Sequence, residues 1–90
     1  MRFEWDPKKA AINKRKHGVT FDEAVTCFAD PLALVLDEAG HPERLVLIGA
    51  STRDRVLFTV FAELIDDHVR IVSARFATRH ERSRYEEGTE

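Results

Sequence analysis

The chain has 90 residues, of which 43% are hydrophobic, and its formal net charge is −2. This length allows one domain, spanning residues 1–90, and the apolar content excludes disorder over most of it. No apolar run is long enough to cross a membrane, and the first residues lack the apolar stretch of a signal peptide. The single cysteine, Cys27, has no disulfide partner within the chain. We therefore expect a reduced, cytoplasmic protein with Cys27 in its core.

The charges are segregated along the chain. Residues 1–20 carry six basic and two acidic side chains, whereas residues 21–67 carry three basic and ten acidic ones. Residues 68–84 are basic again, with five arginines and one glutamate. If the two basic segments meet on one side of the fold, they form a positive patch able to hold phosphate. If they do not, each is simply a solvated face.

The first thirty residues predict a strand and two helices. Residues 2–5 alternate polar and aromatic side chains, as a short strand does. Asp6 followed by proline starts a helix over 7–17, which Gly18 ends. Thr20 and Glu23 have the spacing of a capping box, in which each side chain accepts the other residue's backbone N–H. The second helix ends at Asp30-Pro31, and its apolar stripe predicts core residues Phe21, Ala24, Val25 and Phe28.

From residue 33 the periodicity changes to that of strands. We expect strands over 33–36, 44–50, 55–62 and 68–74, with a seven-residue loop, Asp37 to Glu43, after the first. The other two links are short enough for hairpins, so neighbouring strands are antiparallel. The sequence therefore predicts an α+β fold with two N-terminal helices, a four-stranded antiparallel meander sheet and a short C-terminal helix, followed by a frayed tail over 86–90.

The last predicted strand runs directly into the last predicted helix. Thr78 and Glu81 form a second candidate capping box at this junction. Arginines without lysines surround it: Arg75, Arg79, Arg82 and Arg84. Guanidinium groups suit bidentate contacts to phosphate, but they also pair with carboxylates, and the sequence leaves both interpretations open. In the same way, His17 is either a functional imidazole or a favourable partner of the helix dipole.

The motifs in their order resemble the BrnT family. They are Phe3–Asp6, Asn13, Lys16–Val19, Phe21, Glu23-Ala24, Glu43-Arg44, Ile48-Gly49, Arg70–Arg75, Ala77-Thr78, Glu81-Arg82 and Tyr85. The resemblance implies a RelE-like fold and a ribonuclease toxin of a type II toxin–antitoxin module, which inhibits translation. It further implies neutralisation by a BrnA-like antitoxin, through which the complex binds operator DNA.

Metal-independent RNA cleavage needs a base, an acid and cations at the phosphate. Lys16 and His17 are candidates for base or acid, with Glu43 as an alternative base. The candidate phosphate ligands are Arg53, Arg75 and Arg79, and the RNA-binding candidates are Lys14, Arg15, Arg82 and Tyr85, whose ring can stack a base or whose hydroxyl can donate a proton. The four histidines are scattered, which predicts no metal site and no cofactor.

Two other functions compete with the ribonuclease. One is a non-catalytic domain that binds an antitoxin and tunes its repressor activity. The other is a fold-related toxin that poisons gyrase. Growth arrest on expression of the chain alone separates the first alternative from the ribonuclease, and DNA damage signalling identifies the second.

Overall fold

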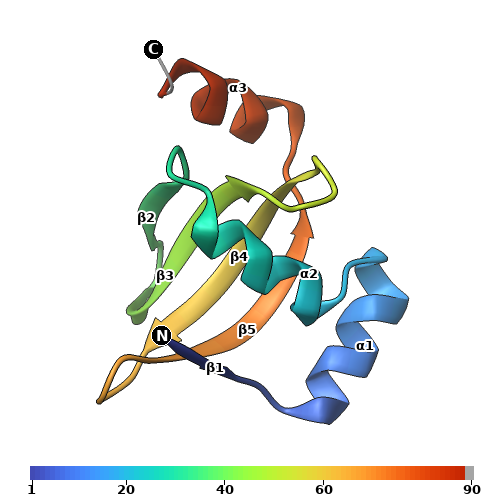
Figure 1. Cartoon of the computed structure of the whole chain (residues 1–90), viewed down its shortest axis with the longest axis vertical. Coiled ribbons are helices and arrows are strands. Elements are labelled where there is room, and N and C mark those ends of the chain that lie inside the picture. The colour runs from blue at the N-terminus through green and yellow to red at the C-terminus, as the bar shows by residue number, and fades with distance from the viewer. Residues whose placement is uncertain (89–90) are drawn as a thin grey trace.

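One five-stranded sheet carries the helices of the fold (Figure 1). The computed structural model describes residues 1–88, in which the strand order is β1-β5-β4-β3-β2. The elements in chain order are β1 (Arg2–Glu4), α1 (Pro7–His17), α2 (Phe21–Thr26), the 3-10 helix η1 (Cys27–Ala29), β2 (Leu34–Glu38), β3 (His41–Ala50), β4 (Val56–Glu63), β5 (His68–Phe76) and α3 (Arg79–Glu87). Strands β2 to β5 form an antiparallel meander, and β1 lies parallel to β5.

The α+β class is confirmed, but the four-stranded sheet was an incomplete prediction because β1 joins it as a fifth, parallel strand. The predicted loop from Asp37 to Glu43 is wrong. Strand β2 continues to Glu38 and β3 begins at His41, so only a two-residue turn remains, with Gly40 at φ +80°. Pro42 is tolerated in β3 because it has no register partner: pairing with β4 starts only at Leu45, and the register with β2 shifts between His41 and Leu45.

Helices α1 and α3 begin with the predicted capping chemistry. Helix α1 spans the predicted residues: Asp6 accepts the N–H of Lys8 at 2.8 Å, and Gly18 ends the helix at φ +70°. At α3 the capping box is complete, because Thr78 and Glu81 each accept the other's backbone N–H. This helix continues to Glu87, so the tail is not frayed from residue 86 as predicted; residues 89–90 lie outside the described part of the chain.

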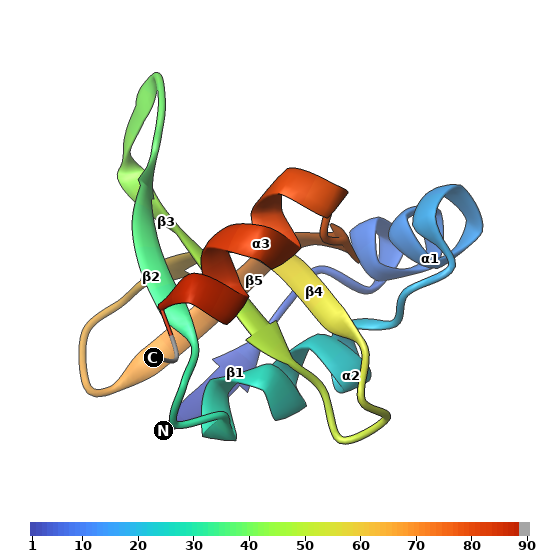
Figure 2. The same cartoon turned by 90° about the horizontal axis from the view of Figure 1, so that it is seen from above.

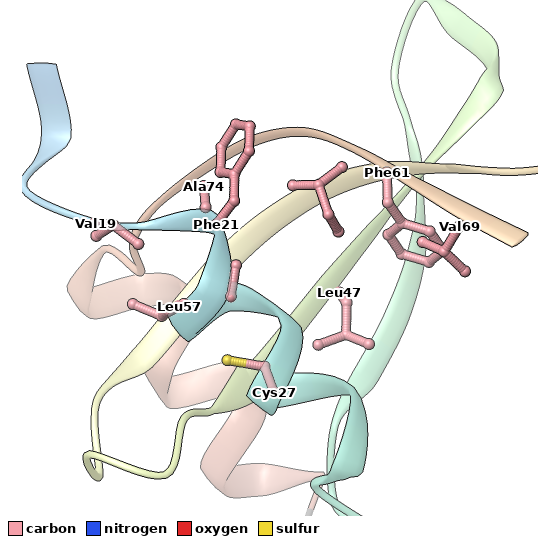
Figure 3. Close-up of a cluster of buried hydrophobic side chains, with 10 residues drawn as sticks. Val19, Phe21, Cys27, Leu47, Leu57, Phe61, Val69 and Ala74 are labelled. Atoms are coloured by element: carbon pink, nitrogen blue, oxygen red, sulfur yellow. The ribbon is translucent and has the colours of Figure 1, made fainter. Parts of the chain in front are cut away.

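The sheet buries side chains on both faces, with α2 on one face and α3 on the other (Figure 2). Under α2 lies the larger cluster, which includes Phe21, Cys27, Leu57 and Phe61 (Figure 3). Burying a side chain of this size contributes roughly 1.5–3 kcal/mol. Burial also raises the pKa of the Cys27 thiol to about 12, which makes it an inert core residue. The second cluster, Val46, Ile48 and Val60, lies under α3. None of the helices in residues 1–88 is long and apolar enough to cross a membrane.

Candidate functional site

Asn13 fastens α1 to the edge of β5. Strand β1 pairs only with residues 68–70 of β5, so α1 meets the rest of that edge. The Asn13 side chain is buried; it donates to the carbonyls of Ala74 at 2.8 Å and Val19 at 3.0 Å, and it accepts the N–H of Ala74 at 3.1 Å. These bonds fix the C-terminal half of α1 against the strand residue that precedes Arg75.

The last turn of α1 presents four basic side chains beside β5. Lys14, Arg15 and Lys16 are exposed, and His17 is half-buried. Lys16 and His17 line a hollow of about 200 Å³ together with Val72 and Ser73 of β5 and with Lys9, Ile12 and Asn13. Val72 packs against the cluster under α3, and the Arg75 guanidinium lies over Phe58 of the same cluster. The two basic segments of the chain therefore reach the same stretch of β5.

Arg75 forms a bidentate pair with Glu81. Its Nη1 and Nη2 donate to the two carboxylate oxygens at 2.8 and 3.0 Å, and its guanidinium stacks 3.9 Å from the centre of the Phe58 ring. The hydrogen bonds from Arg75, opposed by burial and aided by the Thr78 N–H, hold the pKa of Glu81 below its usual value. Arg75 is thus a structural anchor of α3. Its side chain is still 36% exposed, so it can also meet a phosphate at the surface.

The three α3 residues predicted as RNA ligands have different environments. Arg79 and Arg82 are exposed. Tyr85 is half-buried, and its hydroxyl donates to Asp30 at 2.6 Å while its ring packs on the cluster under α3. The bond to Asp30 raises the Tyr85 pKa to about 12. The ring and hydroxyl of Tyr85 are therefore engaged in holding α3, which opposes its predicted role in base stacking or proton donation.

Glu23 organises the hairpin between β3 and β4. Thr20 caps α2 by accepting the Glu23 N–H at 3.1 Å, but the Glu23 side chain does not close the predicted capping box. It instead accepts from Ser51 at 2.7 Å and from Arg55 in a bidentate pair, with Arg53 3.7 Å away. Chiefly because of the Arg55 contact, the pKa of Glu23 is lowered. Arg53 keeps a side chain that is 69% exposed and remains able to contact RNA.

Glu43 lies at the other end of the sheet. It lies near the start of β3 beside His41 and Arg44, whereas Arg53 follows the end of that strand. At about 3.3 Å per residue, Glu43 lies roughly 23 Å from Ala50 along the strand. Figures 1 and 2 both show this hairpin across the sheet from α1. Glu43 therefore does not join the other candidate residues, and its prediction as an alternative base is not supported by its position.

The sequence reasoning overlooked Arg55 and Phe76. The Arg55 guanidinium lies 4.9 Å from the centre of the Phe76 ring, which is 44% exposed. The sequence did contain one indication of Phe76: an aromatic residue follows Arg75 at the end of a largely apolar strand. Among residues 1–88 no three His, Cys, Asp or Glu side chains gather as metal ligands would.

Comparison with known proteins decides the family. The family model of the BrnT ribonuclease toxin of type II toxin–antitoxin systems matches residues 5–81. The chain belongs to the BrnT family. A BrnT toxin of this type acts on RNA and is accompanied by an antitoxin, so an RNA substrate and an antitoxin partner follow from membership.

A solved BrnT structure has the same fold. The crystal structure of the Brucella abortus ribonuclease toxin, BrnT, superposes with a TM-score of 0.72 at 23% sequence identity, covering 88% of this chain and 99% of that one. A search of curated proteins gave no match. At this identity the structural likeness concerns the BrnT fold, and the site residues rest on the geometry above.

Proposed function

We propose that this BrnT protein is a metal-independent endoribonuclease that inhibits translation and acts where α1 meets the end of β5. The observation that carries the proposal is the bonding of Asn13 to Ala74, which brings the helix turn containing Lys16 and His17 to the strand residue before Arg75. Titratable groups and guanidinium groups are the parts that metal-free RNA cleavage requires.

In the proposed reaction a base takes the proton of a ribose 2′-OH, and the 2′ oxygen attacks the adjacent phosphorus. The bond to the 5′ oxygen breaks, and an acid protonates that oxygen, which leaves a cyclic phosphate and a free 5′-OH. The imidazole of His17 has one nitrogen that can accept a proton and one that can donate it, so His17 serves as base or acid, with Lys16 beside it. Arg75, Arg79 and Arg53 stabilise the charge on the phosphoryl oxygens. Lys14, Arg15 and Arg82 hold the flanking backbone.

Arginine geometry at position 75 provides the test. Arg75→Lys keeps the charge and loses the planar fork, so we expect cleavage of single-stranded RNA to fall about a hundredfold, or about 3 kcal/mol in activation free energy. The matched control is Arg70→Lys on the same strand, because Arg70 also pairs with a glutamate, Glu4, at 2.8 Å but lies where β1 ends. The control should cleave at the wild-type rate. Equal rates for both variants would remove Arg75 from the site.

Metal independence is tested on the same RNA. Cleavage should continue at an unchanged rate in excess chelator. Loss of cleavage with EDTA, followed by recovery with magnesium, would overturn this part of the proposal.

We further propose that a BrnA-like antitoxin neutralises the toxin by covering the basic end of α1, and that the complex binds operator DNA through the antitoxin. Charge complementarity speeds encounter and rejects wrong partners. Reversal of Lys14, Arg15 and Lys16 to glutamate should slow association with the antitoxin and weaken it, whereas Lys8→Glu in the first turn of α1 should have a small effect. Unchanged binding of the triple variant would place the interface elsewhere.

A non-catalytic antitoxin-binding domain is the second candidate. The observation that favours it is the engagement of Arg75 with Glu81, which gives this arginine a structural role without RNA. Expression of the chain without its neighbouring gene distinguishes the two, because only a ribonuclease arrests growth and degrades RNA. The ribonuclease family match favours the enzyme, and it also speaks against gyrase poisoning.

A further inference from the structure

An exposed aromatic ring stands at the end of β5. Phe76 is 44% exposed, whereas Phe21 and Phe61 in the core are 2% and 4% exposed. Its register partner on β4 is Leu57, so Phe76 faces the α2 side of the sheet, opposite to Arg75. A phenylalanine that served only to close the core would bury most of its ring, because the apolar surface that stays in contact with water contributes nothing to the hydrophobic stabilisation of the fold.

The ring is backed by an arginine that cannot easily move. The Arg55 guanidinium lies 4.9 Å from the ring centre. The same guanidinium donates from Nε to Glu23 at 2.8 Å and from Nη2 to the other carboxylate oxygen. Glu23 is only 7% exposed and is also held by Ser51. The arginine and the ring are therefore positioned before any ligand arrives, which lowers the entropic cost of binding.

A hollow of about 400 Å³ adjoins this pair. It is lined by Asp54, Arg55, Val56, Phe76, Ala77, Arg82 and Glu86. Its two acidic and two basic side chains give no excess of positive charge for a phosphate inside it, while the ring of Phe76 and the guanidinium plane of Arg55 suit a flat, uncharged group. Arg82 at the same hollow can meet a phosphate at its mouth.

We propose that Phe76 and Arg55 form a stacking subsite for one unpaired base of the RNA substrate. The inference rests on the proposed function and adds a base-contacting site to it. Unstacked bases in single-stranded RNA commonly stack on aromatic rings and guanidinium planes. Arg75 directly precedes Phe76 in β5, and its side chain lies on the opposite face of the sheet. A nucleotide whose base stacks on Phe76 therefore has its sugar and phosphate at the end of β5, beside the proposed phosphate ligands.

The test measures binding of short single-stranded oligonucleotides with 2′-O-methyl riboses, which cannot be cleaved. Phe76→Ala should weaken binding about tenfold to a hundredfold, and Phe76→Trp should tighten it. Phe76→Leu keeps an apolar side chain but lacks a π-face, so it should resemble the alanine variant. Ile65→Ala, which changes another exposed apolar residue, is the control. Circular dichroism and thermal melting establish that each variant is folded.

A second arm identifies the base as the contact. A set of oligonucleotides is compared in which each member lacks the base at a different position. Removal of the base at one of these positions should weaken binding to the wild type but should not weaken binding to Phe76→Ala. Wild-type affinity for Phe76→Ala, or equal losses by both proteins at every position, would overturn the stacking subsite alone. Failure of the wild-type chain to bind or cut any single-stranded RNA would overturn the proposed function as well.

Discussion

Two arginine–glutamate pairs hold the same end of the sheet from opposite faces. On the α2 face, Arg55 pairs with Glu23 and lies over Phe76; on the α3 face, Arg75 pairs with Glu81 and lies over Phe58. The side chain of Glu23 is 5% exposed and that of Glu81 is 18% exposed. The buried pair closes the β3–β4 hairpin over the core, whereas the shallower pair holds a terminal helix. The more deeply buried pair, Arg55 with Glu23, should therefore contribute more to the free energy of unfolding than Arg75 with Glu81.

The largest effect should come from Glu23→Ala. Removal of this buried carboxylate leaves the Ser51 hydroxyl and the partly exposed Arg55 without their partner, so the free energy of unfolding should fall by roughly 3 kcal/mol, the lower limit for breaking a fully buried pair. Urea unfolding followed by the fluorescence of Trp5, the single tryptophan, measures it. Asp22→Ala, at the exposed neighbour, should change stability by less than about 1 kcal/mol. A loss of that small size for Glu23→Ala would contradict the role assigned to the pair.

Acid should reveal the same pair. The pKa of Glu23 is lowered in the folded state from its ordinary value of 4.5. The stabilisation is therefore fully present above pH 4.5 and is lost as the pH falls through the folded-state pKa. Glu81 acts in the same direction. The unfolding free energy of Glu23→Ala should consequently decline less steeply below pH 4.5 than that of the wild type.

An intermediate effect is expected for Tyr85→Phe, which removes the hydrogen bond from α3 to Asp30. A hydrogen bond to a charged group contributes about 1.5–3 kcal/mol, and the half-exposed setting favours the lower value. The raised pKa of about 12 means that this stabilisation is present below pH 10 and is lost as the pH rises toward 12. Tyr85 is the only tyrosine, so phenolate absorbance reports its titration directly. A midpoint near pH 10 would show that the bond is absent.

Glu81→Gln should have a smaller effect, about 0.5–1 kcal/mol, because the pair is partly exposed. Glutamine still serves in a capping box, so α3 keeps its start while Arg75 loses a charged partner. Thermal melting measures the loss, and amide hydrogen exchange shows whether it is confined to α3. Loss of cooperative folding would mean that the two pairs do not differ as their burial indicates.

Ile65→Ser, far from both pairs, should have the smallest effect. Ile65 lies in the turn between β4 and β5 and is 83% exposed. A substitution at such a surface position is expected to change the unfolding free energy by no more than about 0.5 kcal/mol and to leave RNA cleavage unchanged. A large drop in either would show that the turn between β4 and β5 takes part in folding or function.

Local patterns in the sequence predicted local structure well. The limits of α1, the meander and the capping box at Thr78 follow from spacings of a few residues, and the structure contains them. The identical spacing at Thr20 and Glu23 did not give a capping box, because Arg55 attracts the carboxylate from 32 residues away. No local pattern contains that contact.

The candidate site was predicted only in part for the same reason. The meeting of α1 with β5 depends on one long-range contact, Asn13 with Ala74, and helical periodicity does not announce it. The positions of Glu43 and Tyr85 depend on strand direction and on the packing of α3. Both side chains were predicted as functional from their residue type alone. In the tertiary structure Glu43 lies far from the other candidates, and Tyr85 holds α3 against the sheet.

The contact between Asn13 and Ala74 also covers part of an edge of the sheet to which another chain could otherwise bind. A strand with a free N–H and carbonyl is a template on which another chain can add, and this is a route to aggregation. The carboxamide of Asn13 has one acceptor and one donor group, like a peptide unit, and it occupies both groups of Ala74 where β1 no longer covers β5. At the opposite edge, the short β2 has an irregular register at Asp37 and Glu38. The Asn13 side chain at one edge, and the irregular register with two carboxylates at the other, thus disfavour the addition of a second chain to either edge of the sheet.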